Sequence, residues 1–295
     1  MPSGTIRVVT GYAPGGSSDL IARLIAGRLS ETTRRSFIVD NRPGAAGSIG
    51  ANVVAHAAPD GYTLLLASSL AISPHLQKGG ALDPQKDLVP VVPVVQIEFA
   101  LVVHPGVQAT NLSEFVTLVK KDPGKYSYAS AGVGSIHHLS MEWFKRLAGI
   151  DLIHIPYKGS GQILPDVITG LVNVTYIGLA QTTSFVKAGK LRVLAIGGPQ
   201  RIAVAPDLVP IAETYPGYNG TTSWDLLAPR GTPREIVQKL NVEVNRILRD
   251  PAVAEQLTSR GLFPLGGTSE EFSIRARSDY ERWGKLIAEI GVKAE

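Results

Sequence analysis

Residues 6–29, IRVVTGYAPGGSSDLIARLIAGRL, decide the fold class of this chain. The segment opens with a short apolar run typical of a buried strand and continues through a glycine-rich loop. From Leu20 to Leu29 apolar residues recur at spacings of three and four, which predicts an amphipathic helix. Strand-like runs follow at residues 37–40 and 62–67, with a helical pattern between them. Strand, helix and strand at this spacing predict a parallel sheet with right-handed crossovers.

The same alternation continues through the middle of the chain. Helical patterns at 112–121 and 138–147 lie among strand-like runs at residues 100–104, 126–129, 152–155, 172–177 and 191–196. After residue 230 only helical patterns remain, and we expect these helices to cover an existing domain. The chain is therefore predicted to form an α/β fold of two doubly wound domains with a ligand cleft between them. The expected first domain combines residues 1–100 with 226–295, and the second spans 101–225.

Composition excludes several classes of protein. The 295 residues are 44% hydrophobic and 18% charged, which suits two globular domains. Cysteine is absent, so disulfides, thiolate catalysis and cysteine-ligated metals are excluded. The 29 Lys and Arg residues are dispersed and the net charge is only +4, so nucleic acid is not an expected partner. Apolar runs are too short for a transmembrane helix, and the start Met1–Gly4 leaves either a cytosolic protein or a secreted chain without its signal peptide.

Two glycine-rich loops with the same chemistry occur between a strand and a helix, one in each expected domain. They are Tyr12-Ala13-Pro14-Gly15-Gly16-Ser17-Ser18-Asp19 and Ser130-Ala131-Gly132-Val133-Gly134-Ser135-Ile136-His137-His138. Glycine lets the backbone approach a ligand closely, and amides at a helix N-terminus favour an anion. We therefore predict that both loops bind one negatively charged group. A plain capped turn is the alternative for the first loop, and Asp19 fits a capping role better because its charge would repel a carboxylate.

Further candidate ligand contacts follow the other strands, because ligands of doubly wound sheets bind at the carboxyl ends of the strands. They are Ser68, Ser69, Tyr157, Lys158 and Gly178. Tyr157 offers a wall and a hydroxyl group. Lys158 offers a charge, although an exposed lysine at a helix start is the commoner outcome.

Motifs of the common enzyme classes are missing. The chain contains no G-x-S-x-G, G-x-x-x-x-G-K-[ST] or H-E-x-x-H pattern, so Ser135 with His138 is a weak indication of a hydrolase, which remains one alternative. The adjacent His137 and His138 cannot direct both rings to one metal ion from a helix, where ligands need spacings of three or four. We expect no enzyme activity, no cofactor and no metal site.

Short segments along nearly the whole chain carry a resemblance to one known family. They are residues 6–9 with 13–19, 40–45, 59–64, 128–132 with 134–135, 156–159, 187–192 and 228–233. In order and spacing these segments resemble the substrate-binding proteins of tripartite tricarboxylate transporters, the Bug (TctC) family. The resemblance implies a periplasmic binding protein of type II-like architecture that captures a small organic carboxylate without chemistry and serves membrane transporter subunits. It also implies that the two loops hold one carboxylate through backbone amides and bridging waters, and that the C-terminal helices return to the first domain.

Several residues depart from the family pattern. Gly11 and Leu171 replace a common proline and glutamine, and Trp224 lies one residue nearer Ala228 than the usual tryptophan. Asp225, if it faces the cleft, would repel an anion or pair with an amino group. These departures leave the far end of the ligand open between aliphatic and aromatic acids, with Trp224 and Asp225 as candidate contacts. We expect a monomer, and a sensor domain that signals to a membrane partner remains an alternative.

Overall fold

The computed structural model describes residues 4–12, 14–15, 17–44, 47–68, 70, 72–76, 82–157 and 162–292. It divides the chain into two compact units. Unit 1 comprises Met1–Gln96 and Ser223–Ala288, and unit 2 comprises Ile97–Thr222 with the residues from Glu289 onward. That each unit is a separate domain with the expected boundaries stays a prediction. Among the helices of the described residues, none has both the length and the apolar character needed to span a bilayer.

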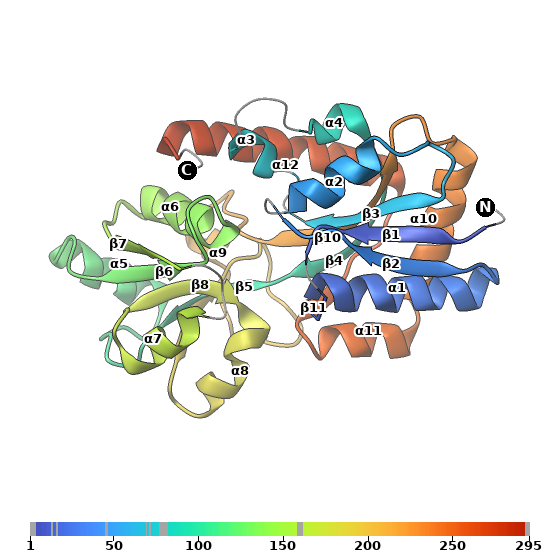
Figure 1. The fold of residues 1–295 in the computed structure, drawn as a ribbon. Coiled ribbons are helices and arrows are strands. Elements are labelled where there is room, and N and C mark those ends of the chain that lie inside the picture. Colours follow the sequence, from blue (N-terminus) through green and yellow to red (C-terminus); the bar gives the residue numbers. More distant parts are fainter. Residues whose placement is uncertain are drawn as a thin grey trace. The chain divides into compact units, whose positions relative to one another are not determined.

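The sheet of unit 1 has the strand order β11-β4-β10-β3-β1-β2 (Figure 1). Its strands are β1 (Ile6–Thr10), β2 (Phe37–Asn41), β3 (Thr63–Ser68), β4 (Leu88–Ile97), β10 (Thr222–Pro229) and β11 (Leu262–Pro264). β1 lies between β2 and β3 and is parallel to both, whereas β10 runs antiparallel to β3. Val8 and Val9 of β1 are fully buried, as expected for a parallel strand that is covered on both faces.

The helices of unit 1 cover this sheet, with α1 and α2 on opposite faces (Figure 1). They are α1 (Ser17–Thr33), α2 (Ser48–Ala55), α3 (Ser73–Leu76), α4 (Pro84–Asp87), α10 (Arg234–Leu248), α11 (Pro251–Thr258) and α12 (Ser269–Ile290). α1 buries Ile21, Ile25 and Leu29 at a spacing of four, so the predicted apolar stripe is present. The neighbouring Ala22 and Ala26 are also buried, and Leu20 is only partly covered.

The sheet of unit 2 has the strand order β7-β6-β8-β5-β9. Its strands are β5 (Phe99–Val103), β6 (Ser127–Ser130), β7 (Ile153–Pro156), β8 (Val174–Gly178) and β9 (Arg192–Ile196). β6 lies between β7 and β8 and is parallel to both, whereas β5 runs antiparallel to β8 and β9. The helices of unit 2 are α5 (Leu112–Lys121), α6 (Ile136–Ala148), α7 (Ile163–Thr169), α8 (Leu179–Lys187) and α9 (Ile211–Thr214).

Both sheets place their first parallel strand between the second and the third, so both have the same topological switch point. In unit 1 this strand is β1, flanked by β2 and β3, and in unit 2 it is β6, flanked by β7 and β8. Ligands of open α/β sheets bind beside the carboxyl ends of the strands at such a point. The two glycine-rich loops follow β1 and β6, and they therefore occupy equivalent positions in their own units. The predicted α/β fold with two sheets is confirmed.

Three strands differ from the sequence-based expectation, and both sheets are mixed rather than parallel throughout. β4 contains Pro90 and Pro93, which argue against a strand inside a sheet because proline donates no ladder hydrogen bond. Its neighbour β11 has only three residues, so their pairing needs few such bonds. β11 also lies in the region expected to be entirely helical. β10 was not predicted as a strand because Ser223 and Asp225 interrupt its apolar run.

Candidate functional site

Asp19 organises the first glycine-rich loop. Its buried carboxylate accepts hydrogen bonds from the Gly15 amide (3.1 Å), Arg23 Nε (2.9 Å) and Asn41 Nδ2 (3.1 Å). The hydrogen bond from Arg23, followed by that from the Gly15 amide, holds the pKa of Asp19 below its usual value. Asp19 is therefore an ionised anchor of the loop. It acts from the third position of α1 rather than as the N-cap, because the helix begins at Ser17.

Asn41, at the end of β2, ties this loop to the neighbouring strand. Besides its bond to Asp19, its side-chain amide donates to the Tyr12 carbonyl oxygen at 3.1 Å. The loop is thus held from both its strand end and its helix end. Asn41 was not a predicted site residue, and its only signal was its place in segment 40–45, which carries part of the family resemblance.

Tyr12, Ser68 and Trp224 come together at the carboxyl end of β3. Trp224 lies opposite Ser68 in the β3–β10 ladder, and its ring meets that of Tyr12 edge to face with 5.3 Å between centroids. Burial raises the pKa of Tyr12, although a hydrogen bond with Ser68 lowers it, so the phenol stays neutral. The Trp224 indole is buried, and its Nε1 has no hydrogen-bond partner among the described residues. Unpartnered buried donors are uncommon in folded proteins, which makes this N–H a candidate ligand contact.

Asp225 belongs to a different cluster from Trp224. Successive strand residues point to opposite faces of a sheet, and the Asp225 carboxylate accepts hydrogen bonds from Arg275 Nη2 (3.0 Å) and Ser223 Oγ (2.8 Å). Burial raises the pKa of Asp225 to about 6, although Arg275 acts against this. These contacts argue against a direct ligand contact. No local pattern indicates them, because Arg275 lies 50 residues further along the chain.

Ser135 is the N-cap of α6 rather than a nucleophile. Its hydroxyl donates to the Gly132 carbonyl oxygen (2.7 Å) and accepts from the His138 backbone amide (3.3 Å). The His138 ring faces another group, because its Nδ1 accepts from the Gly134 amide at 3.1 Å. A serine nucleophile needs a base within hydrogen-bond reach of its hydroxyl, so this geometry disfavours the hydrolase alternative.

Ser130 and the glycines shape the second loop. Ser130, the last residue of β6, is buried, and its hydroxyl lies 3.2 Å from the Gly132 amide nitrogen and 2.6 Å from His154 Nε2. Gly132 and Gly134 have φ angles of 117° and 77°, which L-residues rarely adopt. A Cβ atom on Gly132 would also lie 3.3 Å from the Tyr157 carbonyl oxygen. Glycine is required here by backbone conformation as well as by close approach.

Comparison with known proteins identifies the family. The sequence profile described as "Tripartite tricarboxylate transporter family receptor" (TctC) matches residues 21–292. The chain belongs to this family. BugT of Bordetella pertussis (strain Tohama I) is 32% identical to this TctC receptor, over 99% of this chain and 91% of its own. The family is one of solute-binding receptors, so the prediction of a binding protein rather than an enzyme is confirmed.

Solved structures share the whole fold of this TctC receptor. R. palustris Rpa4515, solved with adipate, superposes with a TM-score of 0.84 at 32% identity and covers 100% of this chain and 99% of its own. MatC (Rpa3494) from Rhodopseudomonas palustris, solved with bound malate, has a TM-score of 0.77 at 30% identity, over 97% and 100% of the two chains. The two-sheet architecture of this chain is therefore shared with Rpa4515 and MatC over nearly its whole length.

The remaining predicted contacts of this TctC receptor have different surroundings. The Tyr157 hydroxyl donates to Asp166 Oδ2, and burial, together with this contact, raises the pKa of Tyr157 to about 12. Gly178 ends β8 and precedes α8, Ser17 and Ser18 open α1, and Ala131 is half-buried. Ala13, Gly16, Ser69 and Lys158 lie outside the described residues.

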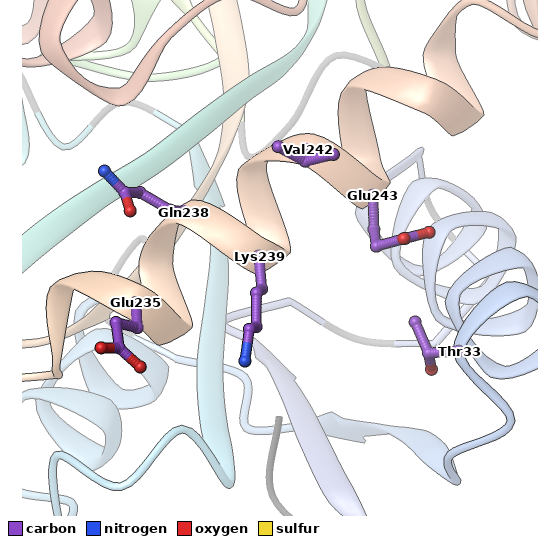
Figure 2. Close-up of a pocket in the computed structure, with 6 residues that line it drawn as sticks. All are labelled: Thr33, Glu235, Gln238, Lys239, Val242 and Glu243. Atoms are coloured by element: carbon purple, nitrogen blue, oxygen red, sulfur yellow. The ribbon is translucent and has the colours of Figure 1, made fainter.

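A surface groove elsewhere in unit 1 does not fit a carboxylate site (Figure 2). It has a volume of about 450 Å³ and is lined by Thr33, Glu235, Gln238, Lys239, Val242 and Glu243. Thr33 is the last residue of α1, so the groove lies about 25 Å along that helix from the glycine-rich loop. Its two glutamates would also repel an anion. In the part of the chain that the structure describes, no three metal-ligating side chains gather into a cation site.

Proposed function

We propose that this TctC receptor is a periplasmic, monomeric solute-binding protein that captures a small organic carboxylate for transporter subunits in the membrane. One observation carries the proposal: the glycine-rich loops of the two units occupy the same topological position, at the carboxyl end of the first parallel strand. The ligands of relatives support the carboxylate class, because Rpa4515 is solved with adipate and MatC with malate.

The donors that we assign to the ligand carboxylate are uncharged. Backbone N–H groups in the first turn of a helix have no intrahelical acceptor, which applies to Ser17 and Ser18 in α1 and to Ile136 and His137 in α6. The helix dipole adds partial positive charge at the same ends. Donors held by the fold bind an anion with little reorganisation.

The glycines of the two loops allow the backbone conformation of the site, but Gly15 and Gly134 do not offer their own amides to the ligand. The amide of Gly15 is used by Asp19, and that of Gly134 by His138. We therefore expect the glycines to bring the first-turn amides close to the ligand. Asp19 does not oppose anion binding, because its charge is compensated by hydrogen bonds from Arg23 and Asn41.

We propose that both loops bind the same carboxylate and that the two units close around it. A ligand that contacts both units stabilises the closed state by its difference in affinity for the two states. The side chains proposed to complete the site come from the strand ends of both units. They are Tyr12, Ser68, Ser130 and Trp224, with Ala13, Gly16, Ser69, Ala131, Lys158 and Gly178 as backbone or neighbouring contacts.

Thermal unfolding with a panel of acids tests the proposal. The protein is first unfolded, washed and refolded to remove any co-purified ligand. An acid present at 100 times its Kd adds about 2.7 kcal/mol of stability, and we expect a clear rise in Tm with one or a few acids. The corresponding primary amide of each acid is the matched control. A panel without any rise, or amides as effective as the acids, would contradict carboxylate binding.

A further inference from the structure

Two stacked histidine rings contact residues of the second glycine-rich loop. His138 is the third residue of α6 and is buried, and His154 lies in β7. Their ring centroids are 4.2 Å apart and their planes differ by 10°. The Tyr128 ring also stacks with that of His154, with 4.8 Å between centroids. His137, next in sequence, is directed elsewhere, with its Nδ1 at 2.8 Å from the Tyr176 carbonyl oxygen.

Each ring of the pair contacts one end of the loop. His138 Nδ1 accepts the Gly134 amide proton at 3.1 Å, which requires the tautomer with its proton on Nε2. His154 Nε2 lies 2.6 Å from Ser130 Oγ, which in turn lies 3.2 Å from the Gly132 amide nitrogen. The loop is thus held at its strand end through Ser130 and at its helix end through Gly134.

The surroundings keep both rings neutral. Burial lowers the pKa of His138 and lowers that of His154 to about 4, and the proximity of the two rings adds to the effect on His154. The charged groups beside them are Glu142 and Lys145, which pair with each other at 2.8 Å, and Glu142 also accepts the Tyr128 hydroxyl proton at 2.6 Å. A neutral His138 keeps the Nδ1 lone pair that the Gly134 amide needs.

We propose that His138 and His154 are positioning residues for ligand capture, which fix the second loop so that the first-turn amides of α6 face the carboxylate. This inference rests on the proposed function. Neither ring is assigned a ligand contact. The pair instead removes conformational freedom from a loop whose glycines would otherwise sample many backbone conformations, so less entropy is lost when the acid binds.

The test introduces both Asn and Gln at each of the two histidine positions, 138 and 154. The Asn side-chain amide places a polar atom near the position of imidazole Nδ1, and the longer Gln side chain reaches the position of Nε2. We therefore expect His138→Asn and His154→Gln to keep acid binding. His138→Gln and His154→Asn should weaken it about tenfold, as expected when a buried hydrogen bond is lost.

Two measurements separate this inference from the proposed function. Adipate and malate affinities are measured by calorimetry, and amide hydrogen exchange of Gly132 and Gly134 is followed in the ligand-free protein. If the wild type binds no acid of the wider panel, the proposed function fails. Amide hydrogen exchange still reports in that case whether His154 protects the Gly132 amide and whether His138 protects the Gly134 amide. If the wild type binds acid but the four variants lose affinity equally, or none loses it, the positioning role is wrong. Unfolding midpoints of the ligand-free variants show whether lost affinity reflects lost folding.

Discussion

Replacing Asp19 with asparagine tests whether the first loop is built around this carboxylate. Oδ2 accepts from the Gly15 amide and from Arg23, and Oδ1 accepts from Asn41. In Asp19→Asn one of these oxygens becomes an NH₂ group that faces a donor. The less costly arrangement places the new NH₂ group opposite the Asn41 side-chain amide. Asn41 cannot rotate this amide to present its oxygen instead, because its Nδ2 also donates to the Tyr12 carbonyl oxygen. One charge-assisted hydrogen bond is lost, and we expect a destabilisation of about 2 kcal/mol.

The matched control is Arg23→Gln. The Arg23 side chain is 58% exposed, and exposed ion pairs contribute only about 0–1 kcal/mol. Urea unfolding at pH 7 should therefore separate the two variants, and the Asp19→Asn loss corresponds to about 2–4 °C in Tm per kcal/mol for a unit of this size. Equal losses in both variants, or a loss below about 0.5 kcal/mol for Asp19→Asn, would refute the anchoring role.

Measuring the stability of the wild type and of Asp19→Asn against pH tests the same prediction in a second way. The folded-state pKa of Asp19 is lowered, so its stabilisation is present above the unfolded-state pKa near 4 and disappears as the pH falls through the folded-state pKa. The wild type should therefore lose stability on acidification relative to Asp19→Asn. Parallel pH profiles would contradict this assignment.

Three further predictions concern other parts of the site. Trp224→Phe should weaken acid binding about tenfold, because it removes an N–H group that has no partner among the described residues. The smaller ring leaves a cavity, so the ligand-free variant should also lose about 1 kcal/mol of stability. Trp283→Phe leaves a similar cavity and is the matched control, and an equal affinity of the two variants for the acid would exclude an indole contact. Gly132→Ala and Gly149→Ala should each destabilise by about 1–2 kcal/mol because both φ angles are positive, but only Gly132→Ala should weaken acid binding in calorimetry. Asp225 has a raised folded-state pKa of about 6, so the stability of the wild type should fall as the pH rises from about 4 through 6. Asp225→Asn should remove this pH dependence when stability is measured by urea unfolding. An unchanged pH dependence would show that Asp225 is not its source.

Local patterns predicted the elements well where propensity and burial agree. The α5 prediction, 112–121, coincides with the observed helix, because Asn111 caps its start and its apolar face is regular. β4 was missed because two prolines mask a strand whose apolar residues are nonetheless buried. In the site, the sequence singled out the two loops but not Asn41 or His154, because each acts through a residue more than 20 positions away.

The α/β class, the two glycine-rich loops and the family follow from the linear order of residues, because they depend on periodicity, glycine placement and motif order along the chain. The folded chain was needed to see which polar groups of the loops already have hydrogen-bond partners. It paired Asp19 with Asn41 and Ser130 with His154, and outside the loops it paired Asp225 with Arg275. A hydrogen bond depends on distance and direction in space, and several of the side chains that complete these loops come from other strands.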